Sequence, residues 1–255
     1  MTWRCPFCAH HKRWFLRDGR WRCARCRRSG RLPKRRSFVA GLRSSRKQLK
    51  KLVRYFVLGV PAYRLRFEVS LSQATIQRIY RRIRQAIYAA ALEEMRREPL
   101  AGVVEADEAL FGGARHGKRG WGAAGKVMVF GIYQRNGKVF TFPVASRGRT
   151  TLLPLLSHHT RVGSLYYTDD WCAYASLSVT GQHVVVTKDK GVPKGRDHLN
   201  GIEGFWSYAK HWLYQYRGVP RAYFHLYLKE VEFRFNHRDE NLVPLVMRLL
   251  RRCTR

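Results

Sequence analysis

Acidic residues are scarce in this sequence. Among its 255 residues, 17 are Asp or Glu and 50 are Lys or Arg, which gives a formal net charge of +33. A surplus of this size excludes the near-neutral balance of an ordinary soluble enzyme and indicates a polyanionic partner. Nucleic acid is favoured over an acidic membrane surface as that partner.

Long apolar runs are missing as well. No stretch of eighteen apolar residues could span a bilayer, and the opening MTWRCPFC has no apolar segment of the kind found in signal peptides. The protein is therefore expected to work inside the cell. Hydrophobic residues make up 45% of the chain, which excludes disorder throughout and predicts more than one folded unit.

Cysteine is sparse too, with six in the chain, but four of them form two CxxC pairs: Cys5, Cys8, Cys23 and Cys26. Two such pairs about a hairpin apart predict a tetrahedral, structural zinc site in a zinc ribbon over residues 1–34. Four thiols without a metal would leave this segment with almost no core. The many arginines around the site indicate a contact surface for nucleic acid or protein, whereas Cys172 and Cys253 are isolated and suggest no role.

Residues 44–98 follow a helical period. A first helix should end at Gly59 and Pro61, and Ser72 should cap a longer basic helix. This outline is typical of a helix-turn-helix DNA-binding region. A plain helical linker with a solvated basic face is the alternative. Four residues near the start of the second helix are placed to read base edges: Gln73, Thr75, Gln77 and Arg78.

After Pro99 the period changes to two and the apolar runs become short. We expect, in chain order, strands at 102–111, 126–134 and 138–146, a helix at 150–160, a strand at 163–170, a helical piece at 171–177, a strand at 182–187 and a helix from about 200. This order predicts an α/β RNase H-like core over residues 100–218. A C-terminal helical extension should follow over residues 219–255.

The few acids fall at informative places. Asp107 is expected at the end of the first core strand beside Glu105 and Glu108, Asp169 and Asp170 end the fourth strand, and Glu203 follows the fifth. In an RNase H-like topology these places converge. Three carboxylates would repel one another without a cation, so Mg²⁺ or Mn²⁺ is the expected cofactor. Two such ions support phosphodiester cleavage or strand transfer.

The helix that begins near Asn200 has a buried stripe and a polar stripe beside it. Glu203 and Lys210 both belong to the polar stripe, about 10 Å apart along the helix. A carboxylate for metal and a lysine for phosphate would then face one DNA strand. Taken alone, the pair also fits a solvated glutamate with a lysine too distant to bind it.

Several long motifs carry a resemblance to a known family: VEADEALFGG, GKRGWG, VFGIYQRNGKV, GSLYYTDDWCAY, HLNGIEGFWSYAK and RGVPRAYFHLYLKEVEFRFNHR. With the CxxC pairs, they resemble the bacterial insertion-sequence transposases of the ISXO-type zinc-ribbon group in the DDE superfamily. The resemblance implies an RNase H-like core, two Mg²⁺ ions, cleavage at terminal inverted repeats and joining of the 3′-hydroxyl to target DNA. It also implies a homo-oligomer on paired ends, in the cytoplasm of a bacterium close to its nucleoid.

The resemblance assigns catalytic roles residue by residue. Asp107, Asp169 and Glu203 become the metal-binding carboxylates, with thirty-three residues between the last two. Lys210 matches the family's basic residue seven positions after the glutamate. Two alternatives remain, because Asp170 replaces the usual glycine and because some relatives use an Asn that corresponds to Asn200. Glu203 is preferred, since a carboxylate binds Mg²⁺ better than an amide.

Other candidates and two rival functions stay open. The glycine-rich basic loop at 112–126 is expected to touch the DNA backbone or to be merely solvated. His116, His198 and His237 could contact phosphate or the carboxylates, although surface or capping roles are commoner. The rival functions are a non-catalytic DNA-binding regulator that uses the N-terminal modules, and an RNase H-like nuclease that cuts without joining.

Overall fold

The computed structural model describes residues 3–18, 20–31, 44–112, 125–169, 182–186, 195, 197–216 and 218–251. Several sequence predictions lie outside these residues. They are the helical piece at 171–177, most of the basic loop with His116, and the residues Asp170, Cys172 and Cys253.

The N-terminal unit is a small antiparallel sheet. Strands β1 (Arg13–Phe15), β2 (Arg20–Cys23) and β3 (Ser29–Arg31) pair in that order. Its core consists of Trp21 and the cysteines, and Trp3 meets Trp21 edge to face with 5.1 Å between ring centroids. So few apolar residues leave the unit dependent on what the cysteines bind.

A helical region follows. It comprises α1 (Arg46–Val57), the 3₁₀ helix η1 (Ala62–Phe67) and the long helix α2 (Gln73–Arg97). The predicted cap is confirmed, because the Ser72 side chain accepts a hydrogen bond from the Thr75 N–H. The apolar faces of these elements share one core with the C-terminal helix α6 (Leu242–Arg251).

The central sheet has five strands in the order β6-β5-β4-β7-β8. Their bounds are β4 Val103–Phe111, β5 Val127–Gln134, β6 Val139–Val144, β7 Leu165–Thr168 and β8 Gln182–Val185. The first three strands along the chain form an antiparallel meander, and β7 and β8 run parallel to β4. The Asn136-Gly137 pair in the sequence is a hairpin-turn signal, and a turn with Asn136 at φ 59 does join β5 to β6.

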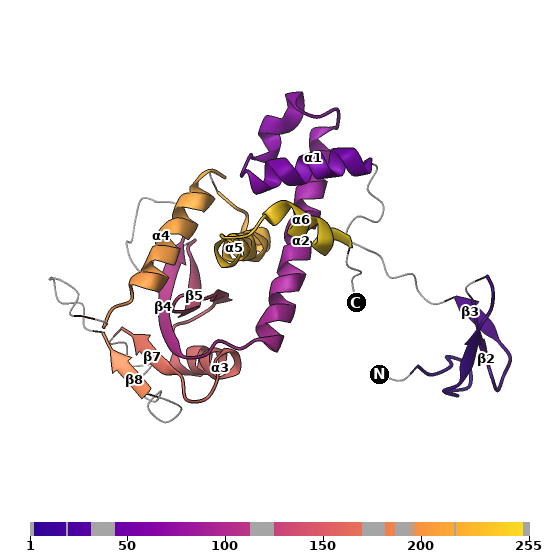
Figure 1. Cartoon of the computed structure of the whole chain (residues 1–255), viewed down its shortest axis with the longest axis horizontal. Coiled ribbons are helices and arrows are strands. Elements are labelled where there is room, and N and C mark those ends of the chain that lie inside the picture. Colours follow the sequence, from indigo (N-terminus) through magenta and orange to yellow (C-terminus); the bar gives the residue numbers. More distant parts are fainter. Residues whose placement is uncertain are drawn as a thin grey trace.

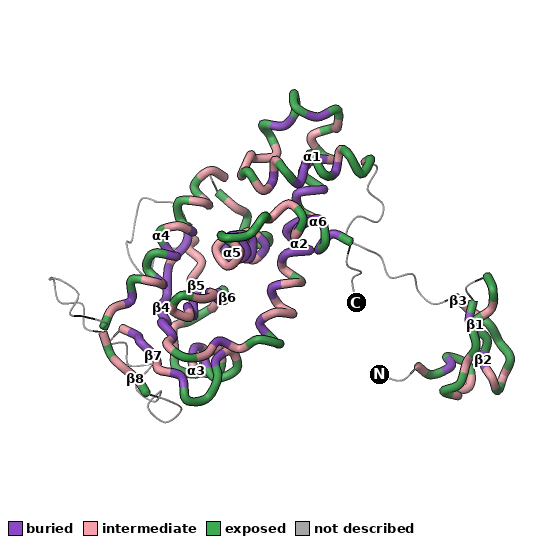
Figure 2. Tube along the Cα trace, viewed as in Figure 1, coloured by how far each residue is buried: buried purple, intermediate pink, exposed green. Residues whose placement is uncertain are grey.

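Helices cover both faces of this sheet (Figure 1). On one face lie α4 (Asn200–Tyr214) and α5 (Arg221–Asn236), and on the other lie α3 (Arg149–His159) and the end of α2. The central strand β4 is consequently buried almost along its length, as Figure 2 shows. Its side chains alternate between the two faces, so Ala109 and Phe111 pack toward α4 whereas Val104 and Ala106 pack toward α3.

Helix α5 lies between the sheet and α2 (Figure 1) and buries charged side chains. Glu230 binds Arg84 of α2 at 2.6 Å and Arg234 of its own helix at 3.0 Å. Arg234 also donates to the carbonyl oxygens of Phe56 and Val57 at the end of α1. A single glutamate thus connects α5 with α2 and, through Arg234, with α1.

Within the described ranges, no helix combines the length and the apolar character that a membrane-spanning segment needs.

Candidate active site

The parallel pairing of β4 and β7 brings the first two predicted carboxylates together. Glu105 pairs with Tyr167 in this ladder, and the same register two residues further on sets Asp107 beside Asp169. The prediction that Asp107 ends its strand is wrong, because β4 continues to Phe111. It is β7 that ends one residue before Asp169, so the two aspartates meet where the parallel pairing stops.

Glu108 is the third member of this cluster. Carboxylate oxygens of Asp107, Glu108 and Asp169 all lie within 4.8 Å of one another. Asp107 and Glu108 are largely buried, and Asp169 is half-buried. Successive residues of a strand point to opposite faces, which is why the pattern gave Glu108 no role as a ligand. The run of three acids in VEADEALF, in a chain with so few, is the signal that could have suggested it.

Trp206 of α4 contacts this cluster directly. Its indole N–H donates to Oδ2 of Asp107 at 3.1 Å. The indole reaches the sheet because Gly131 stands opposite Asp107 in the β4–β5 ladder. A Cβ at Gly131 would lie 2.5 Å from the Trp206 ring, so any larger residue there would push the indole away. In the sequence, helical spacing from Ile202 and Ala209 places Trp206 on the buried stripe of its helix, and this pattern gives no sign of the bond to Asp107.

Glu105 joins the start of α4 to the sheet. One of its oxygens accepts the Ile202 N–H at 2.8 Å, and the other accepts from Arg135 at 2.7 Å. Arg135 also donates to the His198 carbonyl oxygen at 2.6 Å. Gly201 permits this approach, since a Cβ there would lie 2.9 Å from Oε2 of Glu105. The buried glutamate therefore fixes where α4 begins relative to β4.

Glu203 lies one residue beyond this attachment, on the exposed side of the first turn of α4. Asn200, Ser207 and Lys210 are exposed with it, so the predicted polar stripe is confirmed. Glu203 does not belong to the cluster of Asp107, Glu108 and Asp169. The helix that carries it is nevertheless hydrogen-bonded to the strand that carries Asp107.

Next to Asp169, Thr168 links the end of β7 to β8. The Thr168 hydroxyl donates to the Asp169 carbonyl oxygen at 2.8 Å and lies 2.8 Å from Nε2 of His183. Burial lowers the pKa of His183, which favours its neutral ring. Of the predicted histidines that the structure describes, His198 lies with its ring 3.9 Å from Glu105, and His237 contacts Glu240 at 2.5 Å.

Oxygen ligands in this arrangement fit a hard divalent cation. Mg²⁺ takes oxygens at about 2.0–2.1 Å in an octahedron, so its ligands lie roughly 3–4 Å from one another. The three carboxylates lie close enough to meet this requirement after small side-chain movements. The cluster is therefore compatible with a divalent-metal site.

The four N-terminal cysteines converge as the spacing predicts. Sγ of Cys5 lies 3.7 Å from Sγ of Cys26, and Sγ of Cys8 lies 3.6 Å from Sγ of Cys23. A zinc ion with Zn–S bonds of about 2.3 Å sets its sulfurs roughly 3.8 Å apart. Burial raises the pKa of the Cys23 thiol, but N–H groups of Cys26 and Arg25 and the neighbouring thiols outweigh it and lower the pKa to about 6. The cluster is thus compatible with a zinc ribbon.

Comparison with known proteins gives the family. The model of the ISXO2-like transposase domain matches residues 99–236, which is more than half of the chain. The chain therefore belongs to the ISXO2-like transposase family, and the resemblance seen in its motifs is confirmed.

One relative and two solved structures are also similar. An uncharacterized transposase-like protein of Haemophilus influenzae is 35% identical over 103 residues, which cover 40% of this chain and 84% of that protein. The Mos1 strand transfer complex has 12% identity and a TM-score of 0.24, over 85% of this chain and 80% of that one. The pre-cleavage Mos1 transpososome has 11% identity and a TM-score of 0.22, over 89% and 82%. TM-scores this low do not establish a shared fold.

Proposed function

We propose that this protein is a DNA transposase that cleaves the ends of an insertion sequence and joins them to target DNA with Mg²⁺ or Mn²⁺. The observation that carries the proposal is the meeting of Asp107 and Asp169, with Glu108, where β7 ends. Membership of the ISXO2-like transposase family supports it. The net charge of +33 supplies the attraction for a polyanionic substrate.

The sheet order supports an RNase H-like core for this reaction. An antiparallel meander of three strands, extended at its first strand by two parallel ones, is the arrangement expected of that fold. This strand order brings Asp107 of β4 close to Asp169, the residue that follows β7. The domain bounds proposed from the sequence, 1–34, 44–98, 100–218 and 219–255, remain predictions.

Within the site, Asp107 and Asp169 would hold the metal. When bound, divalent ions activate the attacking oxygen and stabilise the leaving oxygen. Glu203 is the third ligand implied by the family, and Glu108 is now a second candidate beside it because it already lies within 4.8 Å of the aspartates. Asn200, at the start of α4, stays a rival or a helper to Glu203. Lys210 is exposed on the same stripe as Glu203. It would bind a phosphate of the DNA strand that Glu203 faces.

The N-terminal modules would recognise the terminal inverted repeats. The zinc ribbon and the helices α1 and α2 are rich in arginine and lysine, and a homo-oligomer would hold two ends together.

Removal of zinc by a chelator should unfold residues 3–31, because the four thiolates supply most of that unit's core. Circular dichroism and end-binding curves measured before and after chelation test this; unchanged binding would contradict a role for the ribbon in recognition.

The decisive test uses the full-length protein, DNA carrying the repeats that flank its own gene, supercoiled target DNA and Mg²⁺. Joined product supports the transposase. Cut ends without joined product would instead indicate the nuclease, and binding without cutting would indicate the regulator.

Asp107→Asn should lower cleavage by about 10³-fold, corresponding to ~4 kcal/mol of barrier. Asp239→Asn is the matched control because its side chain is 91% exposed and lies outside the site. Asp107→Asn with wild-type strand transfer would refute the catalytic assignment.

A further inference from the structure

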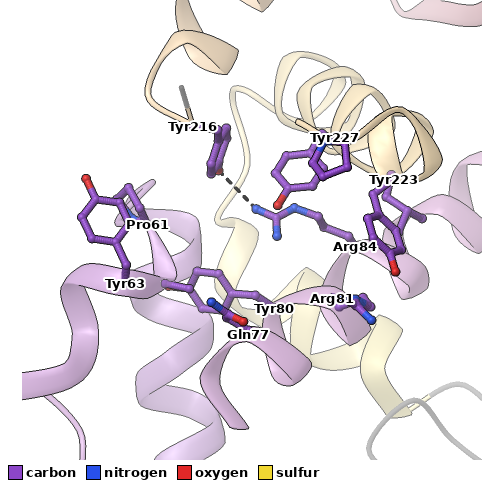
Figure 3. A pocket seen from close by; sticks show the side chains of 12 residues that line it. Pro61, Tyr63, Gln77, Tyr80, Arg81, Arg84, Tyr216, Tyr223 and Tyr227 are labelled. Atoms are coloured by element: carbon purple, nitrogen blue, oxygen red, sulfur yellow. Dashed lines mark hydrogen bonds between the residues drawn. The ribbon is translucent and has the colours of Figure 1, made fainter. Parts of the chain in front are cut away.

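A cavity of about 300 Å³ is lined by none of the residues of the carboxylate cluster. Figure 3 shows this cavity from close by. It is lined by η1 and the proline before it, the first half of α2, the segment between α4 and α5, and the first half of α5. Its size is at the lower end of the range for small-molecule sites. Tyrosine rings from η1, α2, α5 and the segment after α4 line it: Tyr63, Tyr80, Tyr216, Tyr223 and Tyr227.

Arg84 makes the cavity's inner wall rigid. It binds Glu230 at 2.6 Å and donates to the Tyr216 hydroxyl at 3.2 Å. Its guanidinium lies 3.8 Å from the centroid of the Tyr227 ring. Because Arg84 is engaged on three sides, two of the tyrosines are held in fixed orientations before anything binds.

The rim differs from the wall. Gln77 and Arg81, one turn apart on α2, are exposed and line the opening. Among the residues that the structure describes, none forms a hydrogen bond or ion pair with either side chain. The Arg81 guanidinium lies over the Tyr223 ring at 4.6 Å. An amide that can both donate and accept, and a cation without a carboxylate, therefore stand beside an aromatic floor.

We infer that this cavity binds one unstacked nucleobase of the DNA on which the protein acts, with the adjoining phosphate on Arg81. The inference rests on the proposed function, since it takes DNA as the substrate. Tyrosine faces stack on any base, and the Gln77 amide can pair with a base edge. The charged side chains that line the cavity are both arginines, which suits an anionic backbone and disfavours a cationic ligand.

The inference changes the role expected of Gln77. From the sequence it was expected, with three neighbours near the start of the second helix, to read base edges. In the structure it borders a cavity that also involves α5, more than 140 residues further along the chain. Its neighbour Arg78 is exposed and does not line the cavity.

Two DNA duplexes test the inference with the full-length, zinc-loaded protein. One carries a single unpaired 2-aminopurine nucleotide, and the other is the same duplex fully paired. The wild type should bind the first about tenfold more tightly, because stacking of one base on aromatic rings contributes at this level. Quenching of 2-aminopurine fluorescence should accompany binding.

Variants locate the effect. Tyr223→Leu and Gln77→Ala should each bring the ratio of the two affinities close to one, with melting temperatures near that of the wild type. Arg78→Ala, on the same helix but outside the cavity, should weaken binding to both duplexes equally and keep the ratio. Equal affinities in the wild type, or an unchanged ratio in both cavity variants, would overturn the inference and leave the proposed function standing. Failure to bind either duplex would overturn both.

Discussion

Two buried glutamates, Glu105 in the sheet and Glu230 in α5, each hold elements of the fold together, but they bind different partners. Glu230 accepts from two arginines and connects α5 with α2. Glu105 accepts from one arginine and from a backbone N–H at the start of α4. Both side chains are fully buried. The first joins helices to one another, whereas the second orients the helix that carries Glu203 and Trp206 toward the strand that carries Asp107.

The chain has 17 acidic residues, and some of them stabilise the fold whereas others lie at the candidate active site. The two buried glutamates each bind at least one arginine, whereas the cluster of Asp107, Glu108 and Asp169 lies where the parallel pairing ends. Substitution should therefore separate stability from activity. Framework positions should affect the free energy of unfolding, and cluster positions should affect catalysis.

The largest effect on stability is expected for Glu230→Gln. The change would leave Arg84 and Arg234 buried without their carboxylate, and removing one partner of a buried ion pair costs about 3–5 kcal/mol. Urea unfolding monitored by circular dichroism measures this cost. Glu93→Gln is the control, because it affects a surface pair with Arg97 whose side chains are 43% and 67% exposed and should change stability by less than about 1 kcal/mol. Similar costs for the two would contradict a framework role for Glu230.

Glu105→Gln should have a smaller effect on stability than Glu230→Gln and should also lower catalytic activity. The amide can still accept the Ile202 N–H but loses the charge that holds Arg135, so unfolding should become easier by about 1–3 kcal/mol. Because α4 would be less well positioned, kcat for cleavage should fall while DNA affinity is kept. A loss of stability with wild-type kcat would show that Glu105 supports only the fold.

The smallest effect is expected for Trp206→Phe. The aromatic ring is kept over Gly131, but the hydrogen bond to Asp107 is lost, which corresponds to about 1 kcal/mol or roughly a fivefold fall in kcat. Titration with Mg²⁺ should shift to higher concentration, a readout that a packing defect alone would not change. Trp212→Phe, on the same helix but outside the cluster, serves as the matched control.

Much of the fold could be predicted because its signals are local. The Ser72 cap, the turn at Asn136 and the alternation along β4 and β5 each depend on a few neighbouring residues. Asp107 and Asp169 could be singled out because acids are so few and because one lies within and the other directly after a recognisable strand pattern. Glu108 could not, because alternation assigns it to the opposite face of β4.

What the sequence by itself determined is the set of elements, the four cysteines and the acids available for chemistry, since periodicity, capping and CxxC spacing act within a few turns of chain. Tertiary structure alone decided which of those acids meet, that Trp206 donates to Asp107, and that tyrosines from three helices and the segment after α4 line one cavity. Asp107 and Trp206, for example, lie 99 positions apart in the chain. These contacts depend on strand register and on how closely helices approach the sheet, and no local pattern specifies either.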